Sequence, residues 1–295
     1  MRFDWYATTI QDDPFAVIHT LARELRASIE DGHAGHGYEF GVNLRRDDST
    51  IGRVLFGGAN GHPHLIVSSD DCDEIVPVVR RLWQSEHYCT RVDSAEDIDH
   101  GADTWDDLFT LVYAVAEADP EGRKRRLKIS QAGDWLRDPS DPEHAGRTLY
   151  VGSPKSAVRV RLYEKGKELN GKSIGGRPHS DSLCRVEVQV RPEKDSRWTA
   201  ARGTSEDMWG YAEWTRDLLR RLKDAEVERV HIRERRESDL DRALHWLCHQ
   251  YGEHLTTLAG KLGTEHAPGW DKLGTELHRR ILRMQGWAGG SADAA

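Results

Sequence analysis

One short segment in the middle of the chain places a tyrosine and two arginines on the same face. In an extended strand, residues two positions apart point to the same side, so Arg159, Arg161 and Tyr163 share one face and the apolar residues between them share the other. The apolar face can be buried, whereas the polar face is costly to bury without partners. A phenol held between guanidinium groups is suited to meet a phosphate. A solvated basic strand face would show the same alternation.

Two further segments divide in the same way into a polar and an apolar face. The polar face holds Arg91, Asp93 and Asp97 in the first segment, and Arg185 and Glu187 in the second. If the three segments are neighbouring strands, one side of the sheet gathers these groups around the tyrosine. Carboxylate oxygens from separate strands suit Mg²⁺ or Mn²⁺, and arginines orient a phosphate through paired N–H bonds. The pattern predicts metal-assisted phosphoryl transfer; ordinary cross-strand ion pairs are the alternative.

The chain is acidic overall but basic around this tyrosine. Its 295 residues carry a formal net charge of −8, which speaks against a general nucleic-acid binder because phosphate contacts need lysine and arginine. Residues 151–175, however, contain six basic and two acidic residues. Local fields decide where a polyanion binds, so the overall charge is weak evidence here.

The composition argues against several other classes of protein. The four cysteines are widely separated and form no Cys-x-x-Cys pair, which disfavours a zinc site or a disulfide framework. No apolar run approaches the length that spans a membrane, and the first residues lack the apolar core of a signal peptide. We therefore expect a cytoplasmic protein with no membrane partner.

The tyrosine segment belongs to a region in which strands and helices alternate. Gly- and Asp-rich turns separate the expected strands, and helical spacing of apolar residues predicts helices at 72–85 and 103–118. Two successive units of strands, a helix and a further strand indicate an internally duplicated α+β domain, with a mostly antiparallel sheet and helices on one face. The predicted strands are residues 2–9, 38–45, 51–56, 64–68, 88–93, 126–130, 148–152, 158–163 and 183–191.

The character of the chain changes after about residue 192, where charged segments with helical spacing follow. The expected helices are residues 206–237, 239–258 and 273–285. We predict a catalytic domain over 1–195, a helical C-terminal region over 196–288 and a disordered tail over 289–295.

The motifs of the first two-thirds resemble the replication initiation factor family. This family comprises rolling-circle initiators of plasmids and filamentous phages, and related relaxases of conjugative elements. The matching pieces are Thr90-Arg-Val-Asp93 with Asp97, Tyr150-Val-Gly-Ser153, Ser156, Arg159-Val-Arg-Leu-Tyr-Glu-Lys165 and Arg185-Val-Glu187. The resemblance covers roughly residues 1–195, and it implies an HUH-nickase-like fold with DNA-nicking activity.

The resemblance also implies roles for individual residues. Tyr163 would be the nucleophile, and Asp93, Glu187 and, less directly, Asp97 would hold Mg²⁺ or Mn²⁺. Family members often have Glu-x-Glu in the last motif, where this chain has Gln189 in place of the second acid.

The phenol of a tyrosine needs help to react, because its ordinary pKa is about 10. Nearby cations favour the phenolate, and a metal ion would stabilise the crowded oxygens of the transition state. We expect Arg161 and Lys165 to supply the cations. The expected DNA-binding residues are Arg159, Lys155, Arg91 and Arg185.

Attack of the phenolate on a phosphodiester would leave a 5′-phosphotyrosine and a free 3′-hydroxyl that a polymerase extends. The target would be origin DNA in a single-stranded or cruciform state, because the scissile phosphate must reach the sheet face. A host helicase and polymerase are the expected partners, and the C-terminal helices would supply origin recognition or homodimer contacts. The alternatives are a mobilisation relaxase with the same chemistry and a DNA-binding regulator that has lost activity.

Histidines offer a different set of metal ligands. His62 and His64 flank a proline near a strand start, as in the His-hydrophobic-His motif of other rolling-circle nickases, but turn histidines are common in a chain with 15 of them. His245, His249 and His254 fall on a predicted C-terminal helix, where a structural role is favoured.

Overall fold

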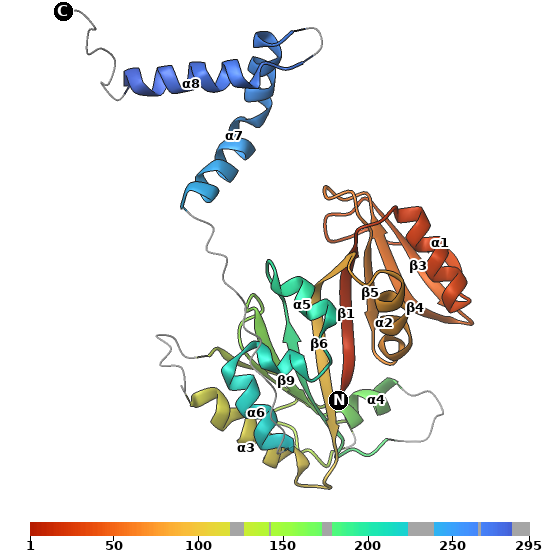
Figure 1. Ribbon diagram of the computed structural model, residues 1–295. Helices are drawn as coiled ribbons and strands as arrows, with labels where there is room; N and C mark the ends of the chain where they lie inside the picture. Colours follow the sequence, from red (N-terminus) through yellow and green to blue (C-terminus); the bar gives the residue numbers. More distant parts are fainter. Residues whose placement is uncertain (119–126, 142, 173–178, 224–238, 265–266, 285–295) are drawn as a thin grey trace, which may run out of the picture. The chain divides into compact units, whose positions relative to one another are not determined.

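The computed structural model describes residues 1–118, 127–141, 143–172, 179–223, 239–264 and 267–284. The chain forms two compact units, Met1–Arg233 and Glu234–Ala295. The first unit is built on a sheet, and the second consists of helices (Figure 1).

The strands of the first unit join in one sheet. They are β1 (Arg2–Ile10), β2 (Ser28–Gly32), β3 (Phe40–Arg46), β4 (Ser49–Phe56), β5 (His64–Ser68), β6 (His87–Ile98), β7 (Ile129–Gly133), β8 (Arg147–Val151), β9 (Val158–Tyr163) and β10 (Cys184–Val190). Their order in the ten-stranded sheet is β2-β3-β4-β5-β1-β6-β10-β9-β8-β7. Every neighbouring pair is antiparallel, which confirms the predicted sheet.

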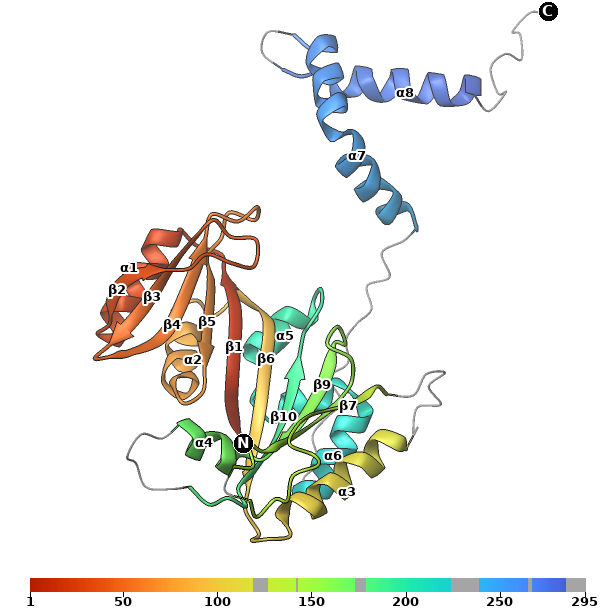
Figure 2. The same ribbon diagram turned by 180° about the vertical axis from the view of Figure 1, so that it is seen from behind.

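The sheet consists of two halves with the same topology. The first half-sheet, β1 to β5, has α1 (Pro14–Leu25) after its first strand and α2 (Asp71–Leu82) after its last. The second half-sheet, β6 to β10, has α3 (Thr104–Glu117) and α5 (Ser196–Arg202) in the same places. The halves meet at β1 and β6, and the strand order is mirrored outward from that pair (Figure 2). The predicted internal duplication is therefore confirmed; α4 (Lys165–Lys172), between β9 and β10, is an addition to the second half.

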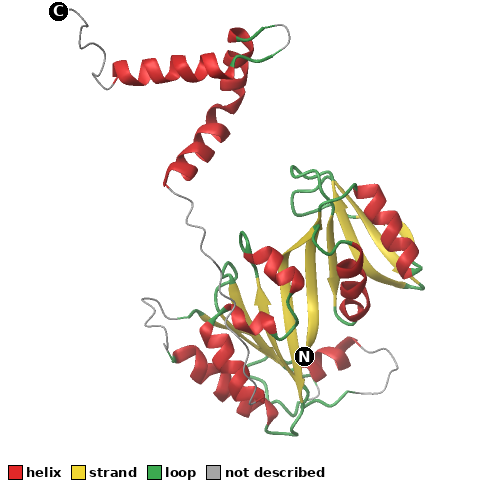
Figure 3. Ribbon diagram, viewed as in Figure 1, coloured by secondary structure: helices red, strands yellow, loops and turns green. Residues whose placement is uncertain are grey.

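Helices lie in front of the sheet in Figure 3, and Figure 2 shows the opposite face, where the strands lie in front of α5 and α6; we call this opposite face the open face. Alternate residues along the strands are apolar, and Val160, Leu162, Val186 and Val188 are 0% exposed. These side chains share one hydrophobic core with residues of α3, α5, η1 (Asp207–Tyr211) and α6 (Glu213–Lys223). The period-two pattern thus decides which face of each strand is buried.

The helices directly after β10 belong to the first unit. α5 packs against β6, and η1 packs against β10. Trp209 and Trp214 are buried, and the indole N–H of Trp209 donates a 3.0 Å hydrogen bond to Ser94 Oγ on β6. The predicted boundary near residue 195 therefore falls inside the first unit, which extends to residue 233, because these tryptophans complete the core on the helix-covered side.

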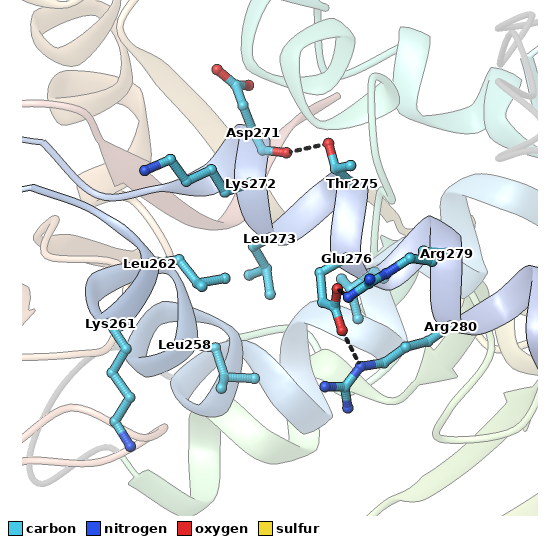
Figure 4. Close-up of a pocket in the computed structure, with 11 residues that line it drawn as sticks. Leu258, Lys261, Leu262, Asp271, Lys272, Leu273, Thr275, Glu276, Arg279 and Arg280 are labelled. Carbon is cyan, nitrogen blue, oxygen red and sulfur yellow. Dashed lines mark hydrogen bonds and ion pairs between the residues drawn. The ribbon is translucent and has the colours of Figure 1, made fainter.

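The described part of the second unit is a pair of helices. The helices are α7 (Asp239–Leu262) and α8 (Trp270–Met284), and the N–H of Gly269 donates to the carbonyl of Ala259 at 2.8 Å. A hollow between them is lined by Leu258, Leu262 and Leu273 and bordered by charged side chains (Figure 4). The predicted tail over 289–295 lies outside the described residues. No helix in the described part of the chain is long and apolar enough to cross a membrane.

Candidate active site on the open face of the sheet

The three strands that carry the predicted site residues are neighbours. β10 lies between β6 and β9. Arg185 on β10 is paired with Asp97 on β6 and with Tyr163 on β9, and Glu187 is paired with Arg161. Cross-strand partners share a face of the sheet, so the structure brings the predicted nucleophile, acids and arginines together on the open face.

Tyr163 ends β9 and is enclosed by cationic side chains. The tyrosine is only 6% exposed. The guanidinium carbon of Arg161 lies 4.4 Å from the centroid of the ring, and the Nζ atom of Lys165 lies 5.5 Å from it. Cations at these distances are attracted to the negative face of an aromatic ring. Lys165 also pairs with Glu168, with Nζ 3.0 Å from Oε2. The two predicted cations therefore contact the ring and fix its position.

The ionisation of Tyr163 differs from the expectation. Burial raises the pKa of the Tyr163 phenol above its ordinary value, and the positive charges of Arg185 and Arg161 only partly oppose this effect. The sequence predicts that neighbouring cations favour the phenolate, but in the structure the loss of hydration outweighs them. The free protein therefore holds a neutral phenol, and a further positive charge at the site would favour its ionisation.

Asp93 and Glu187 each accept hydrogen bonds from an arginine. The Nε atom of Arg91 lies 3.0 and 3.1 Å from the two carboxylate oxygens of Asp93. The Nη2 atom of Arg161 lies 2.5 Å from Oε2 of Glu187. Both carboxylates are almost fully buried, so the arginines neutralise charges that would otherwise be costly inside the protein.

Arg185 joins two carboxylates and is itself 2% exposed. It donates to Asp97 from Nε and Nη2 at 2.5 and 2.7 Å, and to Asp4 from Nη1 at 2.6 Å. Burial raises the pKa of Asp97, but the hydrogen bonds and charge of Arg185 outweigh it, so the net shift is downward. Metal binding by Asp97 and DNA contact by Arg185 stay predictions, and either would require this pair to open.

Asp4 was not among the residues singled out from the sequence. It lies at a register irregularity between Phe3 and Trp5, where β1 pairs with β6. An irregularity of this kind re-aims a side chain relative to its neighbours. An acid in a predicted strand was the only signal in the sequence, and strand alternation alone could not place it next to Arg185.

The two central acids lie on adjacent strands and influence each other. Burial raises the pKa of Glu187, the negative charge of Asp93 raises it further, and Arg161 opposes both. Two carboxylates in this relation favour a cation beside them. In the described residues, however, no group of three or more His, Cys, Asp or Glu side chains is arranged to hold a metal ion.

Gln189 supplies a third oxygen next to these acids. Its Nε2 atom donates to Asp93 Oδ2 at 3.3 Å, while its Oε1 atom is buried without a hydrogen-bond partner in the described structure. A buried acceptor without a partner is destabilising, and amide oxygens are common ligands of hard cations. The oxygen donors of Asp93, Glu187 and Gln189 therefore fit Mg²⁺ or Mn²⁺, although the sequence left the role of position 189 open.

The remaining candidates lie away from this cluster. Lys155 is exposed in the turn between β8 and β9. His64 is buried, its Nδ1 atom is 3.1 Å from Thr9 Oγ1, and its ring stacks on Tyr38 with centroids 5.7 Å apart. Burial lowers the pKa of His64 to about 4. His64 thus has the surroundings of a packed core residue, and among the described residues neither it nor His62 joins a metal-binding group.

The three C-terminal histidines fall on α7. His254 is exposed, and the side chains of His245 and His249 lie outside the part of the structure that is described.

The fold and the site define a protein whose arginine-rich sheet face is suited to phosphate chemistry. Residues 88–266 match the model of the family described as replication initiation factor. The chain belongs to this family, as the motifs indicate. The match begins at β6 and includes the helices after β10, whereas the motifs alone placed the resemblance at residues 1–195.

A solved structure similar to this chain is that of the rolling-circle replication initiator protein from Geobacillus stearothermophilus. The two chains are 19% identical, the alignment covers 81% of this chain and 89% of that one, and the TM-score is 0.49. No curated protein matches the chain.

Proposed function

We propose that this protein initiates rolling-circle replication by nicking one DNA strand at an origin, with Tyr163 as the nucleophile. The observation that supports this most is the placement of Tyr163 beside Arg161 and Glu187, on one sheet face, in a chain of the replication initiation factor family. A tyrosine, a guanidinium and an acid in this relation can attack, orient and neutralise a phosphodiester.

In the proposed step, Tyr163 Oη loses its proton and forms a bond to the phosphorus of a phosphodiester. The bond from phosphorus to the 3′-oxygen breaks, and that oxygen takes up a proton. The products are a 5′-phosphotyrosine and a free 3′-hydroxyl that primes synthesis; a later transesterification reseals the displaced strand. Arg161 would orient the phosphate and offset its charge, while its stacking on the ring keeps Tyr163 in place.

Asp93, Glu187 and Gln189 would hold Mg²⁺ or Mn²⁺, with Asp97 as a further candidate. A bound cation would withdraw charge from the phosphate and from the developing phenolate. Without metal, Arg91 and Arg161 neutralise the two central acids. These arginines would be released toward the DNA phosphates when a cation takes over that role, which couples metal binding to DNA binding.

The substrate we propose is origin DNA that is single-stranded or extruded as a cruciform, because the scissile phosphate must reach the sheet face and a stacked duplex does not present it there. A host helicase and polymerase would act on the nicked product. The α7–α8 unit is proposed to recognise the origin or to form a homodimer. A mobilisation relaxase would use the same chemistry at a transfer origin.

The test is incubation of the protein with its supercoiled replicon and Mg²⁺ or Mn²⁺. We expect nicked circles that carry protein at a 5′ end, and none with Tyr163→Phe or with EDTA. Tyr113→Phe, on the helix-covered side, is the matched control and should nick as the wild type does. Equal nicking by Tyr163→Phe would overturn the assignment of the nucleophile, and DNA binding without any nicking would favour the regulator.

A further inference from the structure

A row of side chains crosses the open face beside the acids and Tyr163. It runs over five neighbouring strands, β1, β6, β10, β9 and β8, and has an aromatic ring at each end with three arginines between them. We call it the arginine row; its members are Trp5, Arg91, Arg191, Arg159 and Tyr150. Arg191 directly follows the end of β10; the pairing of Val190 with Val92 places it opposite Arg91, and the pairing of Gln189 with Arg159 places Arg159 diagonally across from it.

Two arginines of the row lie over the terminal rings. The guanidinium carbon of Arg91 lies 4.5 Å from the centroid of Trp5, and that of Arg159 lies 4.0 Å from the centroid of Tyr150. Stacking fixes the plane of a guanidinium group and leaves its N–H edges directed sideways. The row is therefore organised before any ligand arrives, unlike flexible surface lysines.

Two of the three arginines in the row have no carboxylate partner among the described residues. Asp93 pairs with Arg91, but no carboxylate in the described residues pairs with Arg159 or Arg191. Arg191 donates to the carbonyl of Pro154 at 2.6 Å instead. Like charges gathered in this way repel one another, so an anion bound between them would be stabilised.

Buried polar atoms without partners gather on the same face. Of the six in the described structure, four lie there: Trp5 Nε1, Arg159 Nε, Arg161 Nε and Gln189 Oε1. Three of the four are N–H donors, and two of these belong to the arginine row. Buried donors are nearly always satisfied in folded proteins, so their concentration here indicates a ligand rich in acceptor oxygens.

We infer that the arginine row is a second phosphate subsite, which binds the backbone of the same DNA strand a few nucleotides from the scissile phosphate. Arg159 and Tyr163 are four residues apart on one strand, which is about 13 Å at about 3.3 Å per residue. One extended DNA strand can contact both side chains through successive phosphates. A positive track with aromatic rings is the typical surface for single-stranded nucleic acid. This inference rests on the proposed function, because it extends the substrate of that site.

The test measures binding without chemistry. A fluorescent dT20 oligonucleotide is titrated in EDTA at several NaCl concentrations against the Tyr163→Phe protein. The variants, made in that background, are Arg159→Gln/Arg191→Gln, Arg159→Lys/Arg191→Lys, and Arg23→Gln/Arg220→Gln as the control. Arg23 and Arg220 are exposed on the helix-covered side. Their double substitution removes two positive charges, as Arg159→Gln/Arg191→Gln does.

Each phosphate contact to a single strand contributes about 0.7 to the slope of log K against log salt. We expect the double Gln variant to bind dT20 at least about 10-fold more weakly at low salt, with a slope shallower by about 1.4. The double Lys variant should keep most of the slope, and the control should match its parent. The inference is overturned if the double Gln variant matches its parent in affinity and slope, or if the parent does not bind dT20. Because no nicking is measured, this result is independent of whether Tyr163 is the nucleophile.

Discussion

The two half-sheets share one topology but present different side chains on the open face. In the second half-sheet, β9 and β10 present Tyr163, Arg161 and Glu187. In the first half-sheet, the equivalent strands β4 and β5 pair Leu55 with His64 on this face. That part of the face is also partly covered, because Tyr38 from the loop before β3 stacks on His64.

This contrast shows that duplication supplies a scaffold twice, while side chains decide where a site forms. The first half-sheet contributes to the site on the second half-sheet through β1. From β1, Asp4 binds Arg185 and Trp5 stacks on Arg91. The difference between the two half-sheets can be tested in four further experiments, in addition to the tests of nicking and of the arginine row.

The largest effect on stability is expected where the second half-sheet buries charge. Arg185→Gln would remove the hydrogen bonds that this buried arginine donates to Asp97 and Asp4, which costs about 3 kcal/mol. Arg53→Gln, on the open face of the first half-sheet, removes only an exposed contact to Asn43 and should change stability by less than about 0.5 kcal/mol. Urea unfolding of both variants measures the difference, and equal losses would contradict the contrast.

The first half-sheet should contribute a pH dependence of its own. Burial lowers the pKa of His64 from the ordinary 6.5 to about 4, so between these values the unfolded chain binds a proton that the folded chain does not. The unfolding free energy therefore falls as the pH drops from 6.5 to 4, by about 3 kcal/mol. His64→Asn should remove this fall, and His62→Asn should keep it. Urea unfolding at several pH values tests this; an unchanged slope for His64→Asn would rule it out.

A smaller effect concerns the metal ligands of the second half-sheet. Gln189→Glu would add a negative charge beside Asp93 and Glu187, and ligand charge tunes cation affinity. We expect Mn²⁺ to bind on the order of 10-fold more tightly to this variant, whereas Asp93→Asn should weaken binding by a similar factor. Titration calorimetry with Mn²⁺ measures both. No change for either variant would place the metal elsewhere.

The smallest effect is expected from removing the second unit. A chain ending at residue 233 keeps the sheet and the helices that cover it. Its thermal midpoint should lie within about 3 °C of the full chain, since little of the core is lost. Gel filtration of the two chains tests whether α7 and α8 form a homodimer. A collapse of stability on truncation would show that the two units fold together.

The sequence predicted those strands well in which one face must be buried. The segment 158–163 coincides with β9, and 183–191 contains β10. Four elements were missed: α1, β2, α4 and α5. The sequence signals for α1 were present: Asp13 is the N-cap, whose side chain accepts a hydrogen bond from the backbone N–H of Ala16, and Pro14 is the first residue of the helix. In contrast, β2 is a mostly exposed edge strand and α4 is almost entirely polar, so neither has a hydrophobic pattern that could predict it.

By itself, the sequence determined which residues share a face within each strand, because strand periodicity is a local property of the backbone. Only the tertiary structure decided that β6, β10 and β9 are neighbours. It also decided that Arg185 forms ion pairs with Asp97 and Asp4, and that the helices after residue 195 complete the core of the first unit. The balance that raises the pKa of the Tyr163 phenol is also tertiary, because burial and the charges of residues on other strands set it together. Strand order, register and desolvation all depend on contacts between residues far apart in the chain.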